Sequence, residues 1–231
     1  DIKGDNLIKG INLEGLRVIG KPNKFAIDYY KQGADELLFM DVVATLYGRN
    51  NLEKTIREIS KDIFIPITVG GGIRNIDDAK RMFDNGADKI AINTAVIKNP
   101  KILENLVNKF GSQNIIVSVE AKKLENGKWM AYTHNGREKT NKDVINWIKE
   151  AEKIGAGEIL LTSVDREGMR KGFDAFLARS AYEILKIPLI ISGGMGDTSH
   201  LEEVKNYVDG ICIADALHYK RHNIKEIKAA L

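Results

Sequence analysis

An internal repeat with a spacing of 122 residues constrains the fold of this chain more than any other feature. Gly33-Ala-Asp-Glu36 recurs as Gly155-Ala-Gly-Glu158, which is an offset of 155 minus 33, or 122. Ile65-Pro-Ile-Thr-Val-Gly-Gly-Gly72 recurs as Ile187-Pro-Leu-Ile-Ile-Ser-Gly-Gly194, again an offset of 122. Self-similarity at a fixed spacing indicates related structural units. Each half of the chain therefore carries a copy of one unit.

Short apolar runs alternate with helical patterns along nearly the whole chain. The runs lack polar alternation, which is typical of parallel strands covered on both faces. The predicted strands are Glu36–Asp41, Ile65–Val69, Lys89–Ile92, Ile115–Glu120, Glu158–Thr162, Ile187–Ile191 and Gly210–Ala214. The predicted helices carry apolar residues three and four apart, and they include Asn51–Lys61, Ile76–Asn85, Pro100–Phe110, Lys142–Ile154, Ala175–Lys186 and Ser199–Tyr207. This order predicts βαβ units with right-handed crossovers.

Seven strands are visible, whereas a closed (β/α)₈ barrel has eight. The chain opens at Asp1 with no strand before it, so we expect the first strand to be largely missing from the chain. An open, doubly wound sheet is the alternative, but its single switch point gives no reason for two similar halves. We therefore predict an α/β fold, a (β/α)₈ TIM barrel built of two similar half-barrels. A length of 231 residues fits one domain over residues 1–231.

Composition excludes several classes of function. The 35 basic and 32 acidic residues nearly balance and no stacking aromatics accompany the basic ones, so we expect no nucleic-acid partner. No apolar stretch reaches 18 residues and no signal peptide opens the chain, which predicts a cytoplasmic protein without membrane contact. The lone Cys212 excludes a disulfide framework and is expected to be a buried structural thiol. His218 and His222 have no third ligand nearby and are interpreted as a solvated helix start, so no metal or cofactor is expected.

Each half ends a strand in a glycine-rich turn, Val69-Gly-Gly-Gly-Ile73 and Ile191-Ser-Gly-Gly-Met195. Glycines let backbone N–H groups approach an anion closely. The strands that follow end in Asn93-Thr94 and Ala214-Asp215, and such consecutive loops bind phosphate in barrels of this kind. A glycine turn alone can simply connect strand to helix, but its duplication favours a phosphate site in each half. The two predicted sites are Gly71, Gly72, Asn93 and Thr94, and Ser192, Gly193 and Gly194.

Acidic residues gather where predicted strands end, at Asp1, Asp41, Glu120 and Asp165. Barrel enzymes keep their acids and bases at this end of the strands. Asp1 and Glu120 would follow strands one and five, on opposite sides of the mouth, where one could give a proton to a substrate and the other take one. The alternative for any single carboxylate is a solvated or salt-bridged surface group.

Together these motifs resemble the HisF family, the cyclase subunit of imidazole glycerol phosphate synthase, from Asp1 to about Tyr219. The resemblance rests on Asp1-Ile-Lys3, Lys9-Gly10, Asp35-Glu-Leu37, Thr68–Ile73, Gly86–Lys89, Ile92–Thr94, Phe110–Gln113, Gly155–Glu158, Leu161–Ser163, Asp165-Arg166 and Ser192–Gly194. It implies a lyase that takes ammonia from a HisH-type glutaminase in a heterodimer. The ammonia converts a bis-phosphorylated ribonucleotide to imidazole glycerol phosphate and an aminoimidazole carboxamide ribotide in histidine biosynthesis.

The resemblance also implies roles for individual residues. Asp1 corresponds to a family acid/base, and Glu120 stands where the second catalytic acid is expected. The implied substrate-binding residues are Lys9 in a neighbouring loop, Asp165, and the two phosphate sites given above. The implied ammonia gate at the barrel floor consists of Glu36, Lys89 and Glu158. Each of these three opens a strand, and charged groups there need partners if they are buried.

Three departures from the family leave alternatives open. Glu120 and Glu167 replace aspartates, and Asp215 replaces a serine, which places a negative charge beside a predicted phosphate site. A HisF-like paralogue that channels ammonia to a sugar amidotransferase in lipopolysaccharide or surface-glycan biosynthesis is the second hypothesis. A barrel that only scaffolds or stimulates a glutaminase is the third.

Overall fold

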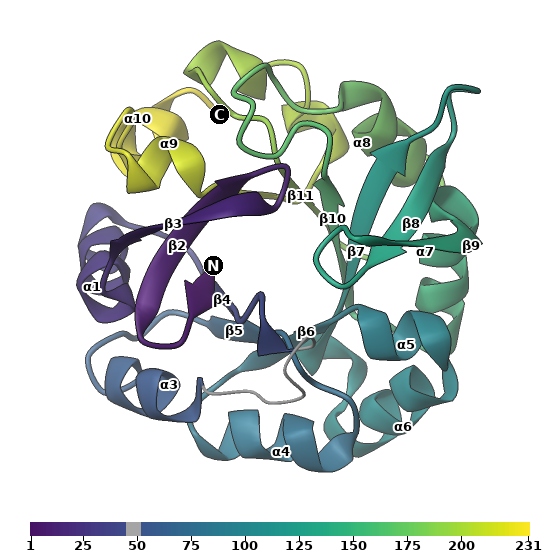
Figure 1. The fold of residues 1–231 in the computed structure, drawn as a ribbon, viewed down its shortest axis with the longest axis horizontal. Coiled ribbons are helices and arrows are strands. Elements are labelled where there is room, and N and C mark those ends of the chain that lie inside the picture. The colour runs from purple at the N-terminus through teal and green to yellow at the C-terminus, as the bar shows by residue number, and fades with distance from the viewer. Residues whose placement is uncertain (45–51) are drawn as a thin grey trace.

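The computed structural model describes residues 1–44 and 52–231 and shows a curled parallel sheet surrounded by helices (Figure 1). The sheet order is β12-β11-β10-β7-β6-β5-β4, and every neighbouring pair in this series is parallel. The strands are β4 (Leu37–Met40), β5 (Ile67–Gly70), β6 (Lys89–Ile92), β7 (Ile115–Lys123), β10 (Glu158–Ser163), β11 (Leu189–Ser192) and β12 (Gly210–Cys212). All seven predicted strands are confirmed, with ends shifted by up to three residues.

The strand β1 (Ile2–Lys3) lies beside the edge of this sheet, where Ile2 forms a parallel bridge with Asp41 just after β4. This position beyond β4 is that of a first barrel strand. Together with the helices on the outside, it makes the fold an α/β (β/α)₈ TIM barrel, as the repeat predicts. The assignment of residues 1–231 to one domain stays a prediction.

Helices follow most strands and cover the outside of the sheet (Figure 1). They are α1 (Pro22–Gln32), α3 (Glu53–Ile59), α4 (Ile76–Asp84), α5 (Thr94–Lys98), α6 (Lys101–Phe110), α7 (Val144–Ile154), α8 (Ala175–Tyr182), α9 (Asp215–His218) and α10 (Ile224–Ala229). Asn51, the first residue of one predicted helix, lies outside the described residues. No helix among the described residues is long and apolar enough to cross a membrane.

The core has two layers. The larger cluster lies between sheet and helices and includes the fully buried Val69, Ile90 and Val117. A smaller cluster of Ala91, Ile116 and Leu160 faces the barrel interior, with Cys212 packed against it. The expectation of a buried thiol is only partly met, because Cys212 is half-buried, although desolvation raises the pKa of its thiol.

The predicted helix over Ser199–Tyr207 is wrong. The segment forms two short 3₁₀ helices, η2 (Thr198–Leu201) and η3 (Lys205–Tyr207). Asp197 accepts hydrogen bonds from both the backbone N–H and the hydroxyl of Ser199, and Val204, with φ −130° and ψ −21°, departs from helical geometry just before η3. Side-chain bonds of this kind compete with a regular helix, so the apolar spacing did not decide the structure.

Two antiparallel hairpins were not predicted. The strands β2 (Asn6–Ile11) and β3 (Glu14–Gly20) form one, and β8 (Trp129–Thr133) and β9 (Glu138–Asp143) form the other. Strand β8 pairs with the second half of β7, opposite residues Glu120–Lys123. Both hairpins therefore follow the carboxyl ends of barrel strands, and in Figure 1 they lie on opposite sides of the barrel opening.

Candidate functional site

One large cavity connects the carboxyl ends of the strands with the barrel floor. Its lining includes most of the residues that the sequence singled out, namely Asp1, Lys9, Gly71, Gly72, Asn93, Thr94, Glu120, Ser192, Glu36, Lys89 and Glu158. These side chains come from strands and loops far apart in the sequence. The barrel thus brings the predicted mouth residues and the predicted floor residues to the two ends of one cavity.

The first glycine turn requires glycine at Gly71. Its φ is +89°, and a Cβ there would lie 2.2 Å from the carbonyl oxygen of Asp41. Gly72 also has a positive φ, of 70°. Both residues line the cavity without side chains, so no Cβ blocks the approach of an anion to this turn.

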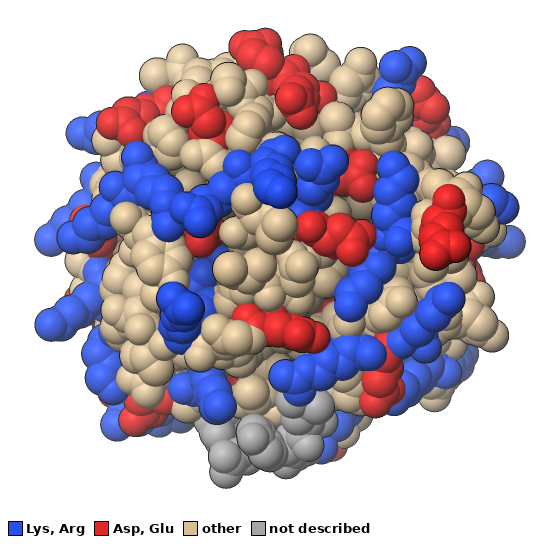
Figure 2. Space-filling model, turned by 45° about the horizontal axis from the view of Figure 1, so that its top comes forward, with Lys and Arg blue, Asp and Glu red and all other residues tan. Residues whose placement is uncertain are grey.

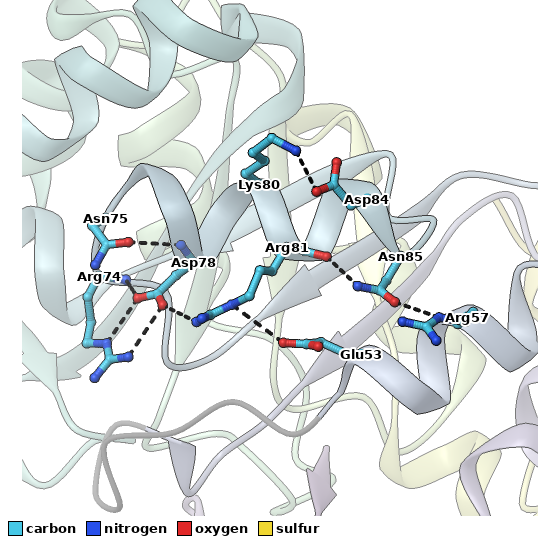
Figure 3. A network of polar contacts seen from close by, with 9 residues as sticks. All are labelled: Glu53, Arg57, Arg74, Asn75, Asp78, Lys80, Arg81, Asp84 and Asn85. Atoms are coloured by element: carbon cyan, nitrogen blue, oxygen red, sulfur yellow. Dashed lines mark hydrogen bonds and ion pairs between the residues drawn. The ribbon is translucent and has the colours of Figure 1, made fainter.

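A polar network fixes the chain directly after this turn (Figure 3). The Asp78 carboxylate, 4% exposed, accepts hydrogen bonds from the backbone and the guanidinium of Arg74, each at 3.0 Å. Arg81 bonds the same carboxylate and reaches Glu53 on α3 at 3.5 Å. Asn75 caps α4 by accepting from the Asp78 N–H at 2.9 Å. The network anchors the start of α4 on α3 and so holds the glycine turn in place.

Asn93 and Thr94 complete the first predicted phosphate site and contact the β8–β9 hairpin. Asn93 donates to the carbonyl of Tyr132 at 3.0 Å, and its Oδ1 is buried without a hydrogen-bond partner among the described residues. The Thr94 hydroxyl accepts from the backbone N–H of His134 at 3.2 Å. A buried oxygen left without a donor is unusual in a native protein. Asn93 Oδ1 is therefore available to a donor on a ligand.

Glu120 projects from β7 into the same cavity. Burial raises the pKa of its carboxyl to about 7, against the opposing effects of a backbone hydrogen bond from Gly136, the Asn93 side chain and the charge of Lys122. The Gly136 N–H donates to Glu120 Oε2 at 2.7 Å. The unpredicted β8–β9 hairpin thus supplies the donor that orients this acid.

The raised pKa of Glu120 predicts a pH-dependent stability. A carboxyl whose folded pKa is about 7, above its ordinary 4.5, stabilises the fold fully below pH 4.5 and loses that contribution as the pH rises through 7. Glu120→Gln stays neutral, so it should raise Tm relative to wild type by about 3 °C at pH 8, the shift for about 1 kcal/mol, and much less at pH 5. Thermal unfolding of both proteins across this range is the measurement. The same Tm difference at every pH would contradict the burial argument.

On the other side of the cavity, Asp1 lies near a buried lysine, Lys9, which also contacts a second acid, Glu167. Lys9 is 3% exposed; its Nζ lies 3.9 Å from Asp1 Oδ2 and contacts the Glu167 carboxylate. Burial lowers the pKa of Lys9 to about 8, although the nearby charge of Asp215 opposes the shift. Glu167 is 6% exposed and lines the cavity, a position that sequence reasoning noted only as a departure from the family.

Two other acidic candidates, Asp165 and Asp41, bond to backbone groups, and of the two only Asp41 lines the cavity. Asp165 is exposed, does not line the cavity, and accepts the backbone N–H of Lys123 at 2.7 Å. Its carboxylate joins the loops after β7 and β10. Asp41 is buried at 3% exposure, and its Oδ1 accepts the N–H of Val43 at 3.1 Å. Both therefore bond to backbone, as do many carboxylates in tight turns.

The second glycine turn is a close backbone contact between two loops. Gly193 and Gly194 have φ values of +92° and +118°, and a Cβ on Gly194 would lie 2.1 Å from the carbonyl oxygen of Gly172. The Gly172 N–H donates to the Gly194 carbonyl at 3.0 Å. Ser192 lines the cavity, whereas the two glycines form the loop behind it.

The three floor residues are in contact. Lys89 Nζ lies 3.0 Å from Glu36 Oε2 and 2.7 Å from Glu158 Oε1, and the Thr68 hydroxyl donates to Glu36 at 2.7 Å. Burial alone would lower the pKa of Lys89, but the hydrogen bonds and charges of Glu158 and Glu36 outweigh it and raise the pKa. Lys89 thus joins the two carboxylates at the floor end of the cavity, and the three residues are called the floor ring below.

The interpretation of His218 as part of a solvated helix start is wrong. His218 is 9% exposed at the end of α9, and its Nδ1 lies 2.6 Å from the Tyr29 hydroxyl with the two rings stacked. Burial lowers its pKa to about 3, so the ring is neutral near pH 7. Within residues 1–44 and 52–231 no group of three or more His, Cys, Asp or Glu residues could hold a metal ion.

Comparison with known proteins places this geometry in a family. The model of the histidine biosynthesis protein family matches residues 1–223. A protein of Legionella pneumophila, the imidazole glycerol phosphate synthase subunit HisF, is 57% identical over 196 residues, which covers 85% of this chain and 92% of that protein. The subunit of the same name from Streptococcus sanguinis (strain SK36) is 41% identical over 233 residues, covering 100% of this chain and 92% of that protein.

Proposed function

This chain belongs to the histidine biosynthesis protein family, and from its site we propose that Asp1 and Glu120 exchange protons with a bis-phosphorylated ribonucleotide held across the barrel mouth. The chain functions as the cyclase subunit of imidazole glycerol phosphate synthase, a lyase-type enzyme of histidine biosynthesis. In this reaction ammonia and the ribonucleotide give imidazole glycerol phosphate and an aminoimidazole carboxamide ribotide.

The observation that carries the proposal is the placement of two acids on one cavity. Asp1 precedes β1 and Glu120 lies on β7, and the order β1-β4-β5-β6-β7 separates these strands by four positions. Four positions are half of an eight-stranded barrel, so the acids approach a bound substrate from opposite sides. The first glycine turn follows β5, between them, where it can bind a phosphate end.

The environments of the two acids favour different proton-transfer roles. The pKa of Glu120, about 7, lets this carboxyl take up and release a proton at neutral pH. Asp1 Oδ2 lies 3.9 Å from Lys9 Nζ, which itself contacts the Glu167 carboxylate. We assign Glu120 to the group that cycles between protonated and ionised forms, and Asp1 to the second proton-transferring acid. Lys9 positions Asp1.

The subunit naming of the relatives implies that this chain works with a partner subunit. We propose that the partner is a HisH-type glutaminase that docks at the barrel floor. Ammonia would then enter through the ring of Glu36, Lys89 and Glu158, which closes the end of the cavity opposite the acids. Opening requires that Lys89 leave at least one of its two carboxylate partners.

Turnover with free ammonia tests the cyclase role without the partner. We expect the purified full-length protein to consume the bis-phosphorylated ribonucleotide in excess ammonium salt and to release both products in equal amounts. Absence of turnover, with the ribonucleotide still bound, would reject cyclase chemistry at Asp1 and Glu120. It would instead favour a barrel that delivers ammonia to a separate sugar amidotransferase.

A further inference from the structure

Asp215, the acidic residue at the start of α9, is paired with two arginines. Arg221 Nη1 lies 2.7 Å from Asp215 Oδ1, and Arg170 Nε lies 3.9 Å from the same oxygen. The Asp215 side chain is only 12% exposed, whereas Arg221 and Arg170 keep 32% and 48% of their side-chain surface in solvent. In Figure 2, Lys and Arg side chains form a band across the side of the molecule where α8, α9 and α10 lie.

This cluster lies against the second glycine turn. A Cβ on Gly196 would lie 2.3 Å from the backbone oxygen and 2.7 Å from the Cβ of Arg170, so the two loops touch at this point. His222, next to Arg221, has its Nε2 3.3 Å from the Gly196 carbonyl. The loops after β10, β11 and β12 thus meet at Arg170, Gly196 and Asp215. These consecutive loops are where barrels of this fold bind phosphate.

The Arg221 guanidinium is held on three sides. Besides the Asp215 carboxylate, it bonds the Asp215 backbone carbonyl at 3.3 Å and lies over the Tyr219 ring, 4.6 Å from the ring centroid. A guanidinium that is fixed before binding loses little side-chain entropy when an anion arrives. Its remaining N–H groups suit the geometry of phosphate oxygens.

The charges in the cluster sum to a cation. Two guanidinium groups and one carboxylate give a net charge of about +1, and Lys9 also lies within electrostatic reach of Asp215. Asp215 places a carboxylate beside the predicted second phosphate site, and the two arginines paired with it outweigh its charge. A serine at this position would leave both arginines without their shared anchor.

We propose that Arg170 and Arg221 bind the second phosphate group of the substrate and that Asp215 positions them. This inference rests on the proposed function, because it assigns one end of the bis-phosphorylated ribonucleotide to this cluster. It makes Asp215 a positioning residue for the phosphate-binding arginines.

A double-mutant cycle tests the proposal in the ammonium-dependent assay. Arg221→Ala should raise KM for the ribonucleotide roughly 10- to 100-fold, the range for losing a charge-assisted hydrogen bond, with kcat changed less than threefold. It leaves the Asp215 carboxylate facing the phosphate with Arg170 alone. The double variant that adds Asp215→Ser to Arg221→Ala should bind the ribonucleotide better than Arg221→Ala alone. It should reverse at least half of the increase in log KM. Arg221→Lys should lie between wild type and Arg221→Ala.

Arg179→Ala is the matched control. Arg179 also pairs with a carboxylate, that of Glu183 at 3.0 Å, and also lies over a tyrosine ring, but both members of this pair are exposed. It should leave KM unchanged. Substrate analogues that carry only one phosphate test which phosphate the arginines bind. With the analogue that lacks the phosphate bound by this cluster, wild type and Arg221→Ala should have the same KM. Thermal unfolding of each variant shows whether it folds. If Arg221→Ala does not fold, Arg221→Lys and Arg170→Ala replace it in the assay.

The outcomes separate this proposal from the proposed function. An unchanged KM in folded Arg221→Ala, an unchanged KM after both arginines are replaced, or a defect equal for both one-phosphate analogues would overturn the phosphate assignment. Lack of turnover by wild type would instead reject the cyclase role. Calorimetric binding of the ribonucleotide to wild type and Arg221→Ala would then still decide the phosphate assignment.

Discussion

Replacing Glu120 with glutamine should lower ammonia-dependent cyclase turnover by about 10²- to 10⁴-fold, the contribution of a positioned acid or base. Glutamine preserves the size of the side chain and can still accept the Gly136 N–H, now 2.7 Å from Glu120 Oε2. It removes only the titrating proton. Steady-state kinetics with excess ammonium salt measure the effect, and in wild type the acid limb should have a midpoint near pH 7, the pKa of Glu120. Asp1→Asn should cause a loss of similar size.

Glu150→Gln is the control for this prediction, because Glu150 pairs with Lys142 at 2.8 Å on the outside of the barrel. It should retain wild-type turnover. Glu120→Asp adds a geometric test: shortening the side chain moves the carboxyl by roughly 1 Å, and such a displacement can cost about 10²-fold in rate. If wild type is active and Glu120→Gln keeps the same kcat, Glu120 is not the proton-transferring group.

Replacing Lys89 with methionine should destabilise the barrel and uncouple it from its partner. The change leaves Glu36 and Glu158 facing each other without the cation now 3.0 Å and 2.7 Å away. Breaking a buried ion pair costs about 3 kcal/mol where the groups keep some exposure, and Tm should fall accordingly. With the glutaminase present, glutamine-dependent turnover should fall far more than turnover with free ammonium, because only the first requires passage through the floor.

Lys80→Met provides the matched control, since Lys80 forms an exposed pair with Asp84 at 2.6 Å on α4. It should change the free energy of unfolding by less than about 0.5 kcal/mol. Both activities should stay intact. An equal loss of glutamine-dependent and ammonium-dependent turnover in folded Lys89→Met would contradict the gate. If Lys89→Met keeps both glutamine-dependent and ammonium-dependent turnover, the floor ring is only structural.

Much of the fold could be predicted because it depends on short-range patterns. Parallel strands covered on both faces require continuous apolar runs, and those runs gave seven barrel strands, all except the short β1. The repeat located both glycine turns, since the backbone contacts at Gly71 and Gly194 permit no side chain. The floor ring followed from charged residues at the starts of strands, which need partners when buried.

The features that escaped prediction depend on contacts between distant segments. The β8–β9 hairpin donates to Glu120 from Gly136, 16 residues away, and Glu167, from the loop after β10, contacts Lys9 on β2. The sequence shows that Asp215 is acidic, but its anchoring of Arg170 and Arg221 appears only when three loops meet. His218 looked solvated because its partner Tyr29 lies 189 residues earlier. The residues that set the electrostatics of the site are therefore the least accessible to sequence reasoning.

The central claim is that acid–base chemistry occurs at the mouth while ammonia arrives through the opposite floor. The most direct test measures, on the same Glu120→Gln preparation, cyclase turnover with ammonium salt and stimulation of the partner glutaminase. We predict that cyclase turnover falls at least 100-fold, whereas glutaminase stimulation stays within about twofold of wild type because the docking face is untouched. Cyclase turnover equal to wild type, or a parallel loss of both activities in a folded protein, would contradict the account.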